Sequence, residues 1–190
     1  MLEVNLARRT TVVAPRPEAA TGPVTIAPLP PEGRLSFRAK AKALDGRSEV
    51  AGFPLSGAIN TVVEADGKVA LRLGPDEWLL RCPEGDCEDH VEAIGAAMEG
   101  KPFSLVDVSH RNVALSAEGA DAALVLNAGC PLDLSDARFP VGTATRTLMG
   151  KAEAVIARIG PASWRVECWR SFGPYVHAFL IDATKDLGRA

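Results

Sequence analysis

A motif that occurs twice, 86 residues apart, constrains the fold of this chain more than any other feature of its sequence. Residues 71–82 read LRLGPDEWLLRC and residues 157–168 read ARIGPASWRVEC. Both copies contain a Gly-Pro pair, a Trp four residues after the Gly, and a Cys four residues after the Trp. Glycine and proline favour a turn, and the apolar residues on either side favour strands. Each copy is therefore predicted to form a strand, a turn and a returning strand.

The repeat continues into a helix after each copy. With one residue lost in the connecting loop, Asp86 corresponds to Ser171, and both are residue types that favour helix N-caps. The expected apolar helix faces, 85 residues apart, are Cys87, Val91, Ile94 and Met98 and then Phe172, Val176, Phe179 and Ala183. A unit that occurs twice, over about residues 69–98 and 155–183, predicts two similar halves packed together, since a solenoid needs at least three copies.

The remaining residues fit a mixed α+β fold. A hairpin is expected at Asp66-Gly67, a pair that tolerates positive φ. Strands are expected at 35–39, 58–65, 69–73, 77–82, 103–108, 112–115, 143–148, 152–159 and 163–168, and helices at 86–98, 118–127 and 172–183. Strands outnumber helices and the helices are widely spaced, which is typical of the α+β class.

The first 31 residues are expected to behave differently from the rest. They contain Pro15, Pro17, Pro23, Pro28, Pro30 and Pro31. Because proline fixes φ and lacks a backbone donor, residues 1–31 are predicted to form an extended arm outside the core, and residues 32–190 a single domain. The arm is either a disordered tail or a segment that orders along a partner, and the apolar run 24–27 slightly favours the second.

Composition excludes several classes of function. A chain of 190 residues with 47% apolar content can bury a core without a metal or disulfide. Its net charge of -3 argues against nucleic acid or an anionic membrane as a partner. We find neither an apolar run of membrane-spanning length nor a signal-peptide pattern, and the four cysteines are too scattered for a secreted disulfide scaffold. A cytoplasmic protein is therefore expected.

Two clusters of polar residues are candidates for chemistry. Cys82, Asp86, Cys87 and His90 lie close together in sequence, but they lack the second ligand pair of a structural zinc site. Asp107-Val108-Ser109-His110-Arg111 joins two strands, and its adjacent serine and histidine would point in different directions. We expect this segment to be a polar turn in which Asp107 bonds its own backbone, with a contact loop as the alternative.

Other patterns point away from an active site. The segment 52–57 has glycine at both ends but lacks the Lys and Ser or Thr that a phosphate loop requires. Trp78, Trp164 and Trp169 could form a stacking surface, yet two of them are repeat equivalents, so packing explains them more simply. His177 is expected to be a satisfied or exposed histidine. No catalytic, cofactor-binding or metal-ligating residue is therefore assigned from the sequence.

Three blocks of the sequence resemble the gamma subunit of heterotetrameric sarcosine oxidase. They are residues 73–80, residues 106–113, and a C-terminal stretch that includes 146–148, Trp164 and Ser171-Phe172. The similarity covers about residues 24–185. This family is similar to the tetrahydrofolate-binding domain of glycine-cleavage aminomethyltransferases, so the resemblance implies two interlocked ferredoxin-like halves.

The resemblance also implies partners and cofactors. Enzymes of this kind contain alpha, beta, gamma and delta subunits, oxidise sarcosine to glycine, reduce oxygen to hydrogen peroxide and pass the one-carbon unit to tetrahydrofolate. FAD and covalently bound FMN belong to the beta subunit, NAD and the folate site to alpha, and zinc to delta. The gamma subunit carries no cofactor, so the resemblance implies a non-catalytic, structural role. Asp107 and Arg111 match a family motif and are expected to be turn and interface residues.

Three alternatives remain open from the sequence. The chain could be the equivalent subunit of the related N-methylglutamate dehydrogenase, whose specificity lies in its larger chains. It could be a free-standing folate-binding protein of the same fold, with Asp107, Asp121 or Asp133 holding the pterin edge. It could also be a metal-dependent hydrolase built on Cys82, Cys87 and His90.

Overall fold

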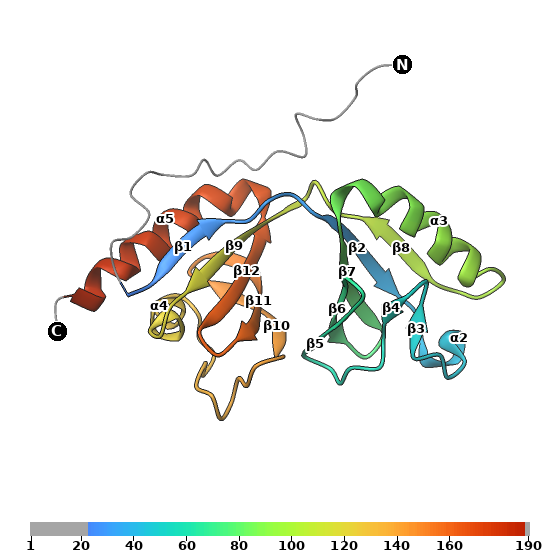
Figure 1. Cartoon of the computed structure of the whole chain (residues 1–190), viewed down its shortest axis with the longest axis horizontal. Helices are drawn as coiled ribbons and strands as arrows, with labels where there is room; N and C mark the ends of the chain where they lie inside the picture. The colour runs from blue at the N-terminus through green and yellow to red at the C-terminus, as the bar shows by residue number, and fades with distance from the viewer. Residues whose placement is uncertain (1–22, 189–190) are drawn as a thin grey trace, which may run out of the picture. The chain divides into compact units, whose positions relative to one another are not determined.

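The computed structural model describes residues 23–188 as an α+β chain with two compact units, which we describe separately (Figure 1). One unit contains residues 31–109, and the other contains residues 23–30 and 110–188. The boundary at 109–110 lies between the two copies of the repeat, within the region 32–190 that we expected to form one domain.

The unit of residues 31–109 is built on an antiparallel five-stranded sheet. In spatial order its strands are β5 (Thr61–Ala65), β6 (Lys68–Gly74), β7 (Glu77–Cys82), β2 (Gly33–Arg38) and β8 (Ser104–Asp107). The helix α3 (Cys87–Ala97) packs on β2 and β8 and buries Ile94 against a core that includes Leu35 and Leu80. Smaller elements complete the unit: α2 (Ala41–Leu44), β3 (Glu49–Val50), β4 (Phe53–Pro54) and the 3-10 turn η1 (Glu84–Asp86).

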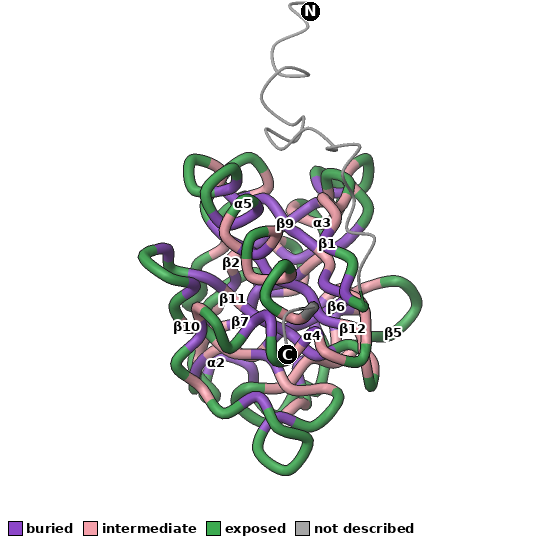
Figure 2. Tube along the Cα trace, turned by 90° about the vertical axis from the view of Figure 1, so that its left-hand side faces the viewer, coloured by how far each residue is buried: buried purple, intermediate pink, exposed green. Residues whose placement is uncertain are grey.

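The second unit has an antiparallel five-stranded sheet of its own. In spatial order its strands are β1 (Thr25–Pro28), β9 (Asn112–Glu118), β12 (Ser163–Trp169), β11 (Ala152–Gly160) and β10 (Ala144–Met149). The helix α5 (Gly173–Thr184) packs on β1, β9 and β12, and Val176 and Leu180 are fully buried in the core. The unit also contains α4 (Ala122–Asn127) and the 3-10 turns η2 (Arg170–Phe172) and η3 (Lys185–Gly188). Figure 2 shows buried residues along β9 and β2 and exposed residues in the loops.

The repeated motif forms the same local structure in both units, as predicted. Strands β6 and β7 pair around the first Gly-Pro turn, and β11 and β12 pair around the second. Both hairpins contain a register shift at matching positions, between Arg72 and Gly74 and between Arg158 and Gly160. The expected hairpin at Asp66-Gly67 is also present, with positive φ at both residues.

The helix part of the repeat differs from our expectation. Each helix follows a 3-10 turn, and Cys87 and Gly173, the first helical residues, are 86 residues apart, so no residue is lost in the second copy. Asp86 stands at the expected N-cap position of α3, although its side chain makes no cap bond, whereas the expectation for Ser171 is wrong because Phe172 is the N-cap of α5. The buried residues of α5 are consequently Gly173, Val176, His177 and Leu180, while Phe172 is exposed.

Part of the expected N-terminal arm belongs to the core of its own chain. Thr25 to Pro28 form β1, which pairs with β9 in the register Thr25–Glu118 to Pro28–Leu115. Val24 and Ile26 are buried in the core of that unit. This corrects the expectation that residues 24–28 lie outside a core; residues 1–22 of the expected arm lie outside the described residues.

Candidate functional site

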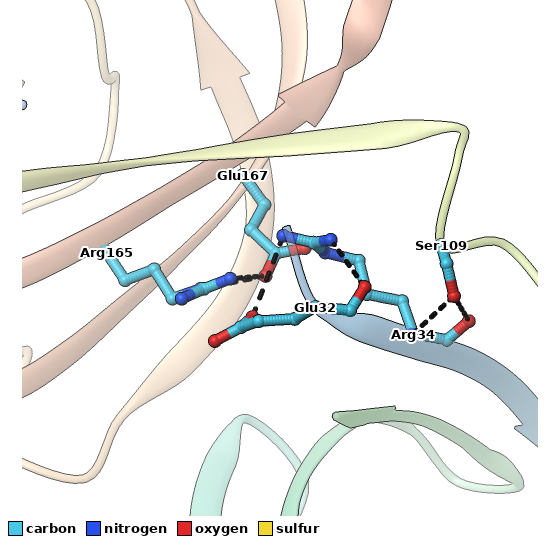
Figure 3. A network of polar contacts seen from close by, with 5 residues as sticks. All are labelled: Glu32, Arg34, Ser109, Arg165 and Glu167. Atoms are coloured by element: carbon cyan, nitrogen blue, oxygen red, sulfur yellow. Dashed lines mark hydrogen bonds and ion pairs between the residues drawn. The ribbon is translucent and has the colours of Figure 1, made fainter. Parts of the chain in front are cut away.

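The segment Asp107–Arg111 begins with a hydrogen-bonded turn. One carboxylate oxygen of Asp107 accepts hydrogen bonds from the Ser109 amide at 2.8 Å and the Ser109 hydroxyl at 2.5 Å. The Ser109 hydroxyl in turn accepts a bond from the Arg34 amide at 2.9 Å, as Figure 3 shows. The predicted polar turn, in which Asp107 bonds its own backbone, is thereby confirmed. The serine hydroxyl is bonded to a carboxylate and to main-chain groups, an arrangement that stabilises the turn rather than one that activates a nucleophile.

The second half of this segment lies in the other unit. His110 and Arg111 are exposed, and the carbonyl of Arg111 accepts a hydrogen bond from the Arg170 amide at 2.7 Å. An open depression of about 580 Å³ lies beside them. Its lining residues are His110, Arg111, Trp169, Arg170, Ser171 and Pro174.

The residues considered as metal ligands have other neighbours. Cys82 and Cys87 are buried, and a hydrogen bond between their side chains, together with burial, raises the pKa of the Cys82 thiol. The His90 ring lies edge-on to Phe53, 5.1 Å between centroids, and burial lowers the pKa of its imidazole. Within residues 23–188 no group of three or more His, Cys, Asp and Glu side chains could hold a metal ion.

The two repeated tryptophans lie in matching surroundings. The Arg72 guanidinium lies 5.1 Å from the Trp78 ring, and the Arg158 guanidinium lies 5.2 Å from the Trp164 ring. Each arginine also donates to the carbonyl of the turn proline, Pro75 at 3.0 Å and Pro161 at 2.6 Å. Both tryptophans are buried, and each packs on a phenylalanine of its own unit, Phe37 or Phe139.

These contacts assign the tryptophans to the cores and reveal a role that our reading of the sequence missed. Each arginine links its tryptophan to the turn. Its guanidinium is attracted to the aromatic face, and the same group donates a hydrogen bond to the carbonyl of the turn proline. The sequence did contain the signal, because an arginine stands two residues before the glycine in both copies of the motif.

A second feature missed from the sequence is a buried ion pair in β12. The guanidinium of Arg165 contacts one oxygen of Glu167 through Nε and a second nitrogen, both at 2.8 Å (Figure 3). The two side chains are 6% and 1% exposed. Residues two apart on a strand share a face, so the pattern Arg-Val-Glu could have suggested the pair. Buried charges of opposite sign neutralise each other, which makes this pair a structural element.

The three aspartates considered for binding a pterin edge line neither of two depressions in the described residues. Asp133 is exposed and accepts a hydrogen bond from the Ser135 amide at 3.0 Å; hydrogen bonds from Ser135 lower the pKa of its carboxyl. Asp121 stands at the N-cap position of α4. The depression beside Trp169 is not lined by these residues or by Asp107, nor is a smaller one of about 330 Å³ beside Arg72 and Trp78.

His177 is buried on α5 and has an interaction partner, as expected for a satisfied histidine. Over the described part of the chain, every helix is too short or too polar to cross a membrane.

Comparison with known proteins finds relatives over most of the chain. The model of the family described as "Sarcosine oxidase, gamma subunit family" matches residues 41–186. The sarcosine oxidase gamma subunit of Corynebacterium sp. (strain U-96) is 33% identical over 140 residues, which are 73% of this chain and 67% of that protein. The one from Arthrobacter sp is 35% identical over 123 residues, 65% of this chain and 60% of that protein.

Solved structures give the same result and confirm the resemblance seen in the sequence. A chain of the heterotetrameric sarcosine oxidase from Corynebacterium sp. U-96 matches with a TM-score of 0.76 and 31% identity, covering 88% of this chain and 87% of that one. Aminomethyltransferase T of the glycine cleavage system from Bartonella henselae matches with a TM-score of 0.63 over 84% of this chain and 46% of that one; at 11% identity this shows a shared fold alone. The chain belongs to the sarcosine oxidase gamma subunit family.

Proposed function

We propose that this chain is the gamma subunit of a heterotetrameric sarcosine oxidase and that it contributes structure rather than catalytic groups. The observation that carries the proposal is the match to a chain of such an enzyme, at 31% identity over 88% of this chain and 87% of that one. Because the match covers nearly the whole of both chains, the two proteins share a complete folded unit rather than one motif. The comparisons name sarcosine oxidase, so the N-methylglutamate dehydrogenase alternative is not favoured.

The contacts of the polar side chains support a structural role. Ser109 holds the turn after β8, Arg72 and Arg158 hold the repeated hairpins, and Arg165 neutralises Glu167. The thiols of Cys82 and Cys168 have raised pKa values, which keeps them protonated and weakly nucleophilic near neutral pH. These groups are occupied in maintaining the fold.

The partners and cofactors follow from the same proposal. The chain would assemble with alpha, beta and delta subunits, which together oxidise sarcosine to glycine with release of hydrogen peroxide and transfer of the one-carbon unit to tetrahydrofolate. FAD, FMN, NAD, tetrahydrofolate and zinc would be held by those subunits. A cytoplasmic location for the assembly remains a prediction.

We also infer that the two units are duplicated ferredoxin-like halves. The order β5-β6-β7-β2-β8 in one sheet parallels the order β10-β11-β12-β9-β1 in the other. Each hairpin of the repeat occupies the same place in its sheet and is followed by a 3-10 turn and a helix. The last strand differs in origin, because β8 follows α3 in the chain whereas β1 precedes all the other strands. The unit of residues 31–109 is therefore inserted in the chain between β1 and β9, an arrangement that interlocked halves would require.

Co-expression with the other chains of the same oxidase tests the proposed role. We expect the full chain to co-purify with them in fixed stoichiometry, and to aggregate or self-associate when purified alone, because an obligate subunit exposes apolar surface without its partners. We expect the isolated chain to contain no flavin and to oxidise no sarcosine. A monodisperse monomer with no affinity for the flavin-containing chains would contradict the proposal.

Calorimetry with tetrahydrofolate separates the proposal from a free-standing folate-binding protein. We expect the isolated chain to release no binding heat at millimolar tetrahydrofolate. Binding below a millimolar dissociation constant that disappears in Asp107→Ala would instead favour the folate-binding alternative.

A further inference from the structure

The depression beside Trp169 is framed by main-chain contacts that fix its walls. One wall is the segment that enters β9, with His110 and Arg111, and the other is the end of β12 with the start of α5. Trp169 pairs with Asn112 in the sheet register, and the Arg170 amide donates to the Arg111 carbonyl at 2.7 Å. Because backbone hydrogen bonds join the two walls, the depression is formed before anything binds in it.

The chemistry of its lining is both aromatic and cationic. Trp169 is 46% exposed, and the neighbouring Phe172 is 39% exposed. Arg111 and Arg170 supply two guanidinium groups, His110 adds an imidazole, and the lining contains no acidic residue. Tryptophan and arginine are the residue types that most often carry the binding energy of protein interfaces. Arginine also fits carboxylates in a bidentate geometry.

The other copy of the repeat shows that the fold does not require these side chains. At an offset of 86, the segment 169–172 corresponds to Pro83, Glu84, Gly85 and Asp86. The main chain forms a 3-10 turn followed by a helix in both copies. Since an acidic, non-aromatic sequence forms the same turn, the aromatic and basic residues of the second copy need an explanation other than folding.

We propose that this depression, the Trp169 site, is the docking site for an acidic segment of a partner polypeptide, with a carboxylate on Arg111 and an apolar side chain against Trp169. The inference rests on the proposed function, and the partner is another chain of the same oxidase. A volume of about 580 Å³ holds a few side chains of one segment. The first 22 residues of this chain fit the site less well, because they contain Arg8, Arg9 and Arg16 against only Glu3 and Glu18.

Photo-crosslinking from Phe172 identifies the occupant without altering the residues that line the site. Phe172 is replaced by p-benzoylphenylalanine, an aromatic analogue, in the co-expressed complex, and the crosslinked peptides are sequenced. We expect a peptide of a partner chain that contains Asp or Glu beside an apolar residue. Crosslinks only to residues 1–22, to a second copy of this chain, or to no protein at all would overturn the proposal.

Charge reversal measures how much the basic lining of the Trp169 site contributes to affinity for the partner chains. We expect the variants Arg111→Glu and Trp169→Ala each to bind the partner chains at least tenfold more weakly. We also expect the affinity of the unchanged chain to fall with added salt. Arg138→Glu, which makes the same change of charge at an exposed position outside the site, is the matched control and should leave affinity unchanged. Circular dichroism of each variant checks that it has folded.

The outcomes distinguish this inference from the proposed function on which it rests. If the unchanged chain does not assemble with the oxidase chains, the proposed function fails. If it assembles and the variants lose less than tenfold in affinity, the proposed function stands and the docking inference is refuted.

Discussion

Truncating the two repeated tryptophans tests whether each one holds its own unit together. Trp78 is 2% exposed and Trp164 is 1% exposed, so each indole is surrounded by protein. Replacement of a buried aromatic residue by alanine removes apolar contact and leaves a cavity, which together cost about 3–5 kcal/mol of unfolding free energy. We expect losses of this size in both Trp78→Ala and Trp164→Ala.

The arginines over the two rings differ in burial, so the loss of unfolding free energy in Trp164→Ala should lie nearer the upper end of that range. A cation on an aromatic face contributes about 0.5–1 kcal/mol when exposed and about 2 kcal/mol when desolvated. The Arg158 side chain is 7% exposed, whereas Arg72 is only half-buried. Removal of the Trp164 ring should therefore cost more than removal of the Trp78 ring.

Urea denaturation followed by far-UV circular dichroism measures both losses. Trp169→Ala is the matched control, because this tryptophan is 46% exposed and its truncation should cost about 1 kcal/mol or less. If Trp78→Ala and Trp164→Ala shift the unfolding free energy no more than Trp169→Ala does, the assignment of both rings to the cores is refuted.

Three further predictions concern a tightly packed glycine, a buried ion pair and a buried thiol. Gly119→Ala should destabilise the chain by about 1–3 kcal/mol in urea denaturation, because Gly119 has a φ of +139° and a Cβ there would collide with the Pro23 carbonyl beside β1; Gly95→Ala, with open space around it, is the control. Glu167→Ala should cost about 3–5 kcal/mol, since it removes the buried carboxylate that the Arg165 guanidinium contacts at 2.8 Å, and an unchanged melting temperature would contradict this. Burial raises the pKa of Cys168 from 9.0 to about 12, so its contribution to stability is complete below pH 9 and is lost as the pH rises from 9 through about 12. Denaturation curves at several pH values should show that loss in the unchanged chain and less of it in Cys168→Ala.

The parts of the fold that depend on local sequence could be predicted. The strand β7 spans Glu77–Cys82, as expected, and β12 extends the expected strand by one residue to Trp169. The helices expected at 86–98 and 172–183 are Cys87–Ala97 and Gly173–Thr184. The Asp107 turn was equally accessible, because an aspartate that bonds the backbone two residues later is a local interaction.

The parts that depend on distant pairing could not be predicted. β1 pairs with β9 across more than 80 residues, and nothing in the run Val-Thr-Ile-Ala specifies that partner. A short apolar run among prolines fits an edge strand as well as an arm, since proline is tolerated at sheet edges. Pro28 ends β1, which is an edge strand of its sheet. The error in the helix offset was local: matching Asp86 to Ser171 by residue type gave 85, whereas the 3-10 turns Glu84–Asp86 and Arg170–Phe172 keep the offset at 86.

The duplication itself separates the residues that hold the fold from those available for recognition. The arginine, glycine, proline, tryptophan and cysteine of the motif occur in both copies, and their contacts lie within the hairpins and cores. The turn after the motif has the same backbone in both copies but is acidic in one and aromatic and basic in the other. A side chain that one copy lacks cannot be necessary for the shared backbone. For this chain, the positions at which the two copies differ on the surface are therefore where its partner contacts should be sought first.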